Sequence, residues 1–461
     1  MSASSGRKLA KDLTVGPVIP TMIRFGIPII LANLLHTAYN MVDTMVVGRM
    51  LGSSALSAVS IGSDVMLLIN LSCNGLCSGA QIIIGQHFGK KDKSEVMNRC
   101  VGTLISLFLL MALGLTAVMI ALASPLVTIL NTPDEIWHET LIYMITCFAG
   151  LVSIFGYNVL GAIQRGMGDS KSPLLFVGVA SVVNLILDLI LVPLMGVFGA
   201  AFATVLAQTV SFVWAFVFLY RRKERFAFDF KRTSFVPDKE IAGQFFKVGL
   251  PICLQNMLMQ CATLFVNSFI FAYGVAATSV NGIGNKLGSV VIIVTNALSR
   301  SGAVMTAQNI AAGKTDRVRR AYLFCAAATT VFAVFLSTIA ILFRKEVFGL
   351  FVTDPEVIEL SALFLPVLIL RFFGFATRAT NLSLINGIGK PRLNLTIGIL
   401  DGFVLRVGVS MLLGQVLGLG LQGYWYGVAI GGFSPLIIGL PYFLSGKWKT
   451  ERLVTQKESE D

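Results

Sequence analysis

The 461-residue sequence has few charged residues and little that suggests a water-soluble protein. Charged residues make up 13% of the chain, against about 25% in an ordinary soluble domain, while hydrophobic residues make up 55%. Regular alternation of polar and apolar residues is also missing, which argues against a transmembrane β-barrel. The composition therefore predicts an all-α membrane protein that crosses the bilayer many times.

The motifs of enzymes and ATP-driven pumps are missing too. No GxxxxGK(S/T) loop, nucleotide fingerprint or catalytic triad occurs, and His36, His87 and His138 do not cluster. The seven cysteines form no CxxC pair and lie mostly in apolar runs, so we expect them to pack as small hydrophobic residues. The polar start MSASSGRKLAKDLT lacks the apolar core of a signal peptide. We expect a non-enzyme without a cofactor, a metal centre or a cleaved leader.

The apolar runs predict twelve transmembrane helices, since each run reaches the roughly 20 residues that a span needs. Their centres lie near residues 33, 68, 110, 147, 180, 207, 258, 292, 331, 367, 404 and 431. Most Lys and Arg residues fall in the N-terminus, in the loops after every second helix and in the C-terminus. By the positive-inside rule, both termini are cytoplasmic. The net charge of +12 therefore indicates contact with membrane lipids and not with nucleic acid.

The two halves of the chain repeat each other. FGIP (25–28) corresponds to VGLP (248–251), and GAQIIIGQHFGKKD (79–92) corresponds to GAVMTAQNIAAGKTD (302–316). Six helices in each half give both halves the same orientation, so an axis along the membrane normal should relate two lobes around a central cleft. The predicted domains are an N-terminal lobe (1–220), a basic cytoplasmic linker (221–245) and a C-terminal lobe (246–461).

Several of these motifs are similar to those of a known transporter family. VDTMVVGRMLG, GQHFGKKD and QRGMGDSKSP followed by NLILD resemble the first half of multidrug and toxic compound extrusion (MATE) proteins, and AQNIAAGKTD and NGIGKPR resemble the second half. The resemblance covers nearly the whole chain. It implies a monomeric antiporter of the bacterial inner membrane that exports small organic compounds in exchange for H⁺ or Na⁺. A lipid-linked precursor flippase of the same superfamily and a channel or scaffold are the alternatives.

Polar residues inside the first and fifth predicted helices mark a candidate coupling site. Asn33, His36, Asn40 and Asp43 are spaced three, four and three residues apart, which places them on one helix face. Asn184 and Asp188 also share a face. A carboxylate at membrane depth costs roughly 2.5–3.5 kcal/mol, so it indicates function, although a position near the interface would explain it as well. Two close carboxylates suit a proton, and their oxygens suit Na⁺.

The resemblance assigns this site more closely. In the DinF-like branch of the family, a helix-1 Asp, an Asn-x-x-x-Asp on helix 5 and a helix-6 Thr form the cation site. Asp43, Asn184, Asp188 and Thr204 match these positions. Asn33, His36 and Asn40 are candidates to modulate this site or to line the substrate cleft, although His36 would equally well simply pack or hydrogen-bond beside Asp43.

The C-terminal lobe has no such carboxylates. Branches with a cation site in this lobe carry acids where this chain has Met259 and Phe375. Arg371 and Arg378 share a helix face, and they would either bind cargo of negative or mixed charge, or only pair with Asp401 or reach the membrane interface.

The repeat also places an acid and a base at equivalent positions. Asp64 follows Gly62 by two residues, and Lys286 follows Gly284 by two residues. We expect the pair either to form an outer gate or to face headgroups separately.

Overall fold

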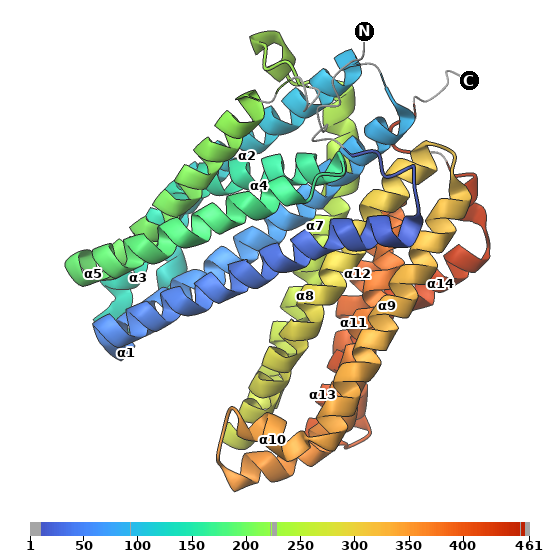
Figure 1. The fold of residues 1–461 in the computed structure, drawn as a ribbon. Coiled ribbons are helices and arrows are strands. Elements are labelled where there is room, and N and C mark those ends of the chain that lie inside the picture. Colours follow the sequence, from blue (N-terminus) through green and yellow to red (C-terminus); the bar gives the residue numbers. More distant parts are fainter. Residues whose placement is uncertain (1–10, 93, 222, 224–227, 452, 457–461) are drawn as a thin grey trace. The chain divides into compact units, whose positions relative to one another are not determined.

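The computed structural model describes residues 11–92, 94–221, 223, 228–451 and 453–456, and within these ranges it contains helices and no strand (Figure 1). The first half contains α1 (Val18–Lys90), α2 (Ser94–Ile129), α3 (Asp134–Ala149), α4 (Leu151–Gly166), α5 (Lys171–Arg221) and the short η1 (Arg232–Phe235). The second half contains α7 (Lys239–Phe271), α8 (Val275–Ala311), α9 (Thr315–Leu342), α10 (Arg344–Gly349), α11 (Pro355–Ile388), α12 (Pro391–Ile399), η2 (Leu400–Val409), η3 (Leu412–Val416), α13 (Gly420–Gly431), α14 (Ser434–Leu444) and η4 (Lys447–Lys449).

These helices supply twelve membrane spans. In the described ranges, ten segments are long and apolar enough to cross a bilayer, and the bent pair α3 and α4, with an angle of 46°, supplies an eleventh. The 51 residues of α5 would extend about 76 Å as one helix, against a hydrocarbon core of about 30 Å. Its backbone leaves the helical region at Gly196 (φ 60°, ψ −139°), which divides it into two spans. The prediction of an all-α fold with twelve transmembrane helices is therefore confirmed.

The repeat is visible in the backbone. α1 contains two spans, Val18–Leu51 and Ser53–Lys90, separated at Gly52 (φ 87°, ψ −172°). The corresponding Gly274, which precedes α8, has nearly the same conformation (φ 95°, ψ −173°). Residues with a Cβ rarely adopt this positive φ, so glycine makes the turn between the first two spans of each half.

Helix packing repeats as well. The ring of Tyr143 on α3 fills the space that a Cβ at Gly62 on α1 would need. The ring of Phe364 on α11 does the same at Gly284 on α8. In each half, therefore, a glycine on the second span allows an aromatic ring of the fourth span to pack closely against it.

The chain divides into two compact units that do not follow the sequence halves strictly. Unit 1 holds Ile27–Phe246 with Lys11 and Asp12, and unit 2 holds Leu13–Gly26 and the chain from Lys247 onward. This differs from the predicted boundaries (1–220, 221–245 and 246–461), because the start of α1 packs in unit 2 and the linker packs in unit 1.

The segment Leu13–Gly16, which we call the N-terminal strap, explains the first difference. Leu13 is fully buried in unit 2. The Arg317 guanidinium on α9 donates hydrogen bonds to the carbonyl oxygens of Leu13 (3.0 Å), Val15 (3.2 Å) and Gly16 (2.5 Å). Three neighbours complete the attachment. The Gln308 side chain accepts a hydrogen bond from the Leu13 amide (3.0 Å). Asn309 donates one to the Leu13 carbonyl, and Lys314 donates one to the Thr14 carbonyl. The strap is therefore held mainly through its backbone.

The linker is held in unit 1 in a comparable way. The amide of Asp229 donates to the Asn98 side chain (3.0 Å), and the amide of Asp238 donates to the Thr103 hydroxyl (3.0 Å), both on α2. Residues 235–238 precede α7 as residues 13–16 precede α1. Each unit thus accepts the segment that leads into the first helix of the other half.

Candidate functional site

The predicted coupling residues of α5 lie on both sides of its break. Because the chain turns back at Gly196, Asn184 and Thr204 approach each other, and the Asn184 amide donates to the Thr204 hydroxyl at 3.5 Å. The turn is tight, since a Cβ at Gly199 would meet the carbonyl of Leu191. The structure therefore brings Thr204 beside the Asn-x-x-x-Asp pair.

Asp188 lies one helical turn beyond Asn184 and is fully buried. In the described part of the chain, both of its carboxyl oxygens and Oδ1 of the partly buried Asp43 are shielded and accept no hydrogen bond. Asp43 lies near enough for its charge to act on Asp188. Buried carboxylates without donors are costly, and binding a proton or a cation relieves this cost. The pair fits a site for H⁺ or Na⁺.

Two further residues join this group, and we call the whole set, Tyr39, Asp43, Asn184, Asp188, Thr204 and Gln208, the acidic cluster. The Gln208 amide donates to the Tyr39 hydroxyl at 3.5 Å, and both carboxylates act electrostatically on Tyr39. The sequence reasoning did not single out Tyr39 or Gln208. The available signal was spacing, since Tyr39 precedes Asp43 by four residues and Gln208 follows Thr204 by four.

The other polar residues of the first span form a separate pattern. The His36 ring lies 3.2 Å from the Tyr39 hydroxyl and 3.2 Å from the Asn40 amide, and both His36 and Asn40 are exposed within the protein. Asn33 lies ten residues before Asp43, about 15 Å along the helix axis. His36 therefore connects to the acidic cluster through Tyr39, whereas Asn33 lies some distance from it.

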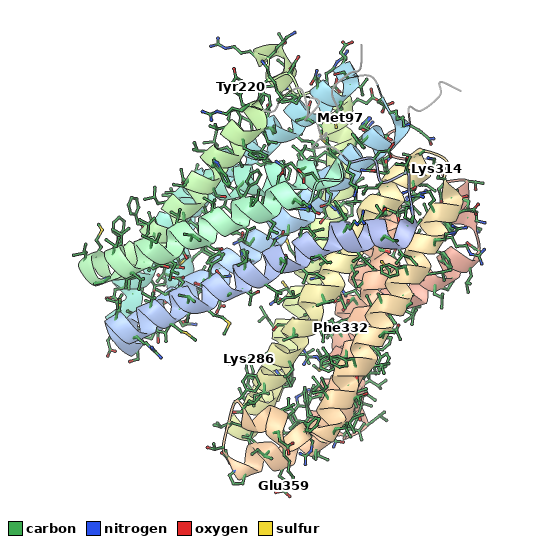
Figure 2. All side chains as sticks on the ribbon, in the orientation of Figure 1. Met97, Tyr220, Lys286, Lys314, Phe332 and Glu359 are labelled. Carbon is green, nitrogen blue, oxygen red and sulfur yellow. The ribbon has the colours of Figure 1, made fainter. Side chains whose placement is uncertain are left out.

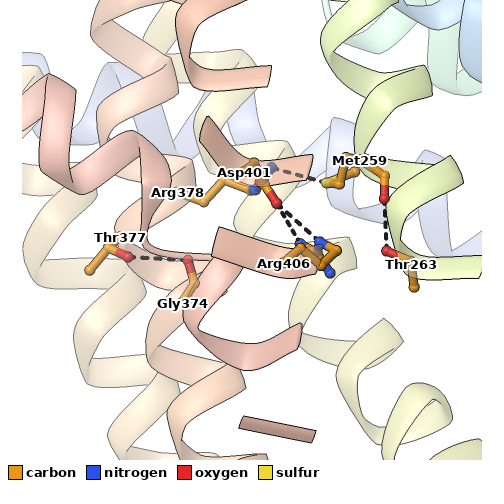
Figure 3. A network of polar contacts seen from close by, with 7 residues as sticks. All are labelled: Met259, Thr263, Gly374, Thr377, Arg378, Asp401 and Arg406. Atoms are coloured by element: carbon orange, nitrogen blue, oxygen red, sulfur yellow. Dashed lines mark hydrogen bonds and ion pairs between the residues drawn. The ribbon is translucent and has the colours of Figure 1, made fainter. Parts of the chain in front are cut away.

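Unit 2 carries an ionic network, shown in Figure 3. Asp401 is fully buried and accepts hydrogen bonds from Nε (3.0 Å) and a terminal nitrogen (2.9 Å) of Arg406. Arg378 pairs with the second Asp401 oxygen and also contacts the Met259 sulfur at 3.1 Å. Asp401 and Arg406 are five residues apart in η2, a π-helix, whose wider turn brings such residues to one face. Of the alternatives for Arg378, the structure shows the ion pair with Asp401.

Arg371 lies midway along α11 and has a different partner. Its guanidinium donates to the Asn285 side chain on α8 at 2.6 Å, and among the described residues it forms no ion pair. Phe375, one turn further, packs against α8, where its ring lies 3.3 Å from the position of a Cβ at Gly288. Met259 and Phe375 therefore lie beside cationic groups, in surroundings that disfavour a cation site. We call Arg371, Arg378, Arg406 and Asp401 the basic cluster.

Asp64 and Lys286 are both exposed within their own units. Figure 2 shows Lys286 on α8, with its ammonium 5.7 Å from the centre of the Phe351 ring. The outer gate stays a prediction. Six of the cysteines are buried and Cys261 is exposed, and the described residues contain no group of three or more His, Cys, Asp or Glu that could hold a metal.

Comparison with known families decides the class. The MatE family model matches residues 28–190 and again residues 251–412. The chain belongs to the MatE family. Its two matches correspond to the two halves of the repeat, and membership makes the chain an integral membrane transporter and confirms the prediction that it is not an enzyme.

MatE relatives resemble the chain over most of its length. The probable multidrug resistance protein YpnP of Bacillus subtilis is 25% identical over 450 residues, which cover 97% of this chain and 100% of that protein. The FAD transporter of Shewanella oneidensis is 26% identical over 365 residues, 77% of this chain and 79% of that protein. A solved outward-facing multidrug resistance MATE family transporter shares the fold, with a TM-score of 0.85, 25% identity, and coverage of 97% of this chain and 100% of that chain.

Proposed function

We propose that this MatE protein is a secondary antiporter of the bacterial cytoplasmic membrane that exports organic compounds in exchange for H⁺ or Na⁺, with both termini cytoplasmic. The observation that supports the proposal is the acidic cluster, in which both carboxyl oxygens of Asp188 and Oδ1 of Asp43 are shielded and accept no hydrogen bond from the described residues, and in which the charge of Asp43 acts on Asp188. The names of the relatives, which refer to multidrug resistance and to FAD transport, support an organic compound as cargo.

The chemistry of the acidic cluster suits an exchanger. Two nearby carboxyl groups hold a proton more firmly than one, because the second negative charge disfavours ionisation of the first. The same oxygens, with those of Asn184 and Thr204, are the ligand types that a hard cation such as Na⁺ prefers. A gradient of the ion drives transport only if the ion binds one conformation of the protein better than the other. Asp43 and Asp188 are the residues through which we expect this preference to act, as in the DinF-like branch.

Reconstituted transport tests the proposal directly. Purified protein in liposomes is given a pH gradient or a Na⁺ gradient separately, and movement of the dye rhodamine 123 is followed. We expect one gradient to drive dye movement and Asp43→Asn to abolish it without loss of folded protein. Asp134→Asn, which removes a similar charge at the exposed first residue of α3, is the matched control and should transport normally. Undiminished gradient-driven transport by Asp43→Asn would exclude this site, and gradient-independent dye flux would favour a channel.

A further inference from the structure

The acidic cluster and the basic cluster consist of groups of opposite charge. In unit 1, the acidic cluster brings together two carboxyl groups, and no described hydrogen-bond donor binds either oxygen of Asp188. In unit 2, the basic cluster holds three guanidinium groups and the single carboxylate of Asp401, and two of these groups, those of Arg378 and Arg406, pair with that carboxylate (Figure 3). Its net charge is therefore positive, within helices that cross the membrane. Such a charge is expensive at membrane depth unless an anion offsets it, which makes it a functional candidate.

Within the basic cluster, the roles of the guanidinium groups differ. Arg406 and Arg378 both pair with Asp401, so the carboxylate is already fully engaged. Arg371 donates to the neutral Asn285 side chain and, among the described residues, forms no ion pair. Asp401 is paired with Arg378 and Arg406 and does not need Arg371 as a partner. If position 371 had only a structural role, an apolar side chain would serve it better than a guanidinium. The Arg371 guanidinium is therefore held in place by a neutral partner, and no carboxylate of the described residues pairs with it.

We propose that Arg371, supported by Arg406, forms a subsite for an oxyanion group, a carboxylate or a phosphate, on the compound that this transporter carries. The inference rests on the proposed export function and names the chemical class of its cargo. A guanidinium presents parallel N–H groups that match the two oxygens of a carboxylate or phosphate. Asn285 fixes the orientation of this fork through a single bond at 2.6 Å and leaves other N–H groups of Arg371 for a ligand.

The side chains beside the basic cluster, Phe375 near Arg371 and Met259 against Arg378, support an organic anion. Phe375 and Met259 are partly buried and offer apolar and aromatic surface next to the cationic groups. Aromatic and thioether side chains beside a guanidinium suit a flat compound that carries an acidic group. A cationic compound would instead meet the repulsion of the basic cluster.

Dye binding tests the inference without a transport cycle. Fluorescein and rhodamine 123 share a xanthene ring system but carry opposite charge at neutral pH. Their anisotropy is titrated with full-length protein in a neutral detergent. We expect wild type to bind fluorescein more tightly than rhodamine 123. Arg371→Met should weaken fluorescein binding by about tenfold to hundredfold, which is the loss of a charge-assisted hydrogen bond, and should leave rhodamine 123 binding no weaker.

The controls separate charge from folding. Lys345→Met removes one exposed positive charge beyond the network and should change neither dye. Asn285→Ala keeps every charge but releases the Arg371 fork, so fluorescein binding should weaken by about twofold to tenfold even if Arg371→Met fails to fold. Phosphatidylglycerol in the micelles displaces fluorescein if the subsite takes a lipid headgroup phosphate, and leaves it bound if the anion is a soluble compound.

Two results would overturn the subsite: fluorescein binding no tighter than rhodamine 123 binding, or an equal loss of both dyes in Arg371→Met. Rhodamine 123 export that depends on Asp43, with no preference for fluorescein, would refute the subsite alone and leave the antiport proposal standing. Export that does not depend on Asp43, together with fluorescein binding that depends on Arg371, would refute the antiport proposal and leave the subsite standing.

Discussion

Replacement of Arg317 by Met should release the N-terminal strap from unit 2. The Arg317 guanidinium donates to the carbonyl oxygens of Leu13, Val15 and Gly16, and its Nε donates to the Asn309 side chain at 2.8 Å. Methionine fills a similar volume but offers no donor. The strap then keeps its apolar contacts and loses most of its attachment through the backbone.

The size of the effect follows from the burial of each carbonyl. A hydrogen bond to a charged group contributes roughly 1.5–3 kcal/mol to stability. A buried acceptor that is left without a partner costs its full desolvation free energy. Leu13 is fully buried, so its carbonyl loses a donor that water does not readily replace. Val15 is 54% exposed, and water replaces much of its bond. We therefore expect opening of the strap to become easier by about 2–4 kcal/mol.

Hydrogen exchange measures this opening directly. Exchange of the amides of residues 11–22, followed by mass spectrometry, should accelerate by about thirtyfold to several hundredfold in Arg317→Met, because local opening controls their exchange. Arg320→Met removes the same charge from an exposed position on α9 and serves as the control. Arg317→Lys keeps the positive charge but loses the branched guanidinium, so its exchange rate should lie between those of wild type and Arg317→Met. If Arg317→Met exchanges no faster than Arg320→Met, the carbonyl contacts do not hold the strap.

Four further predictions concern Asp188, Met259, Asp401 and Gly52. Asp188→Asn should remove gradient-driven export in liposomes, because the acidic cluster then holds a single ionisable carboxyl group; normal export would exclude a role in coupling. Met259→Ala should change the range of dyes transported while leaving ion dependence intact, and loss of that dependence with retained transport would contradict an N-terminal coupling site. Asp401→Asn should destabilise the protein by about 3–5 kcal/mol, since two guanidinium groups lose their buried partner, and a melting temperature within a degree of wild type would argue otherwise. Gly52→Ala should cost roughly 1–2 kcal/mol through its positive φ, seen as a lower melting temperature, and an unchanged value would show that the turn adopts another backbone conformation.

The sequence predicted those features of the fold and site that follow from regular spacing. The spacing of Asn184 and Asp188 placed both on one helix face, and the repeat predicted two halves of the same architecture. It did not predict the pairing of Asp401 with Arg406, because residues five apart share no face of an ordinary α-helix and meet here only in a π-helical stretch.

The strap was equally hard to foresee. Its hydrogen bonds to unit 2 run almost entirely through backbone amides and carbonyls, which every residue carries, so Leu13 and Val15 show no distinctive pattern. The predicted boundary at the linker followed charge and not packing. Tyr39 and Gln208 were missed because single polar residues of these types are common in apolar runs, and only the turn at Gly196 brings Gln208 to the first span.

The positions of the strap and the linker bear on the origin of the repeat. Unit 2 needs Leu13–Gly26 from the first half, and unit 1 needs the residues before Lys247 from the second. A gene cut between residues 221 and 228 would therefore yield two fragments, each missing a piece of its own structure, that should fold well only when expressed together. An ancestral protein of one half would have met the same requirement as a homodimer in which each copy supplied its leading segment to the other, as in domain swapping. Fusion of two such copies would have made this exchange intramolecular without changing the contacts it uses.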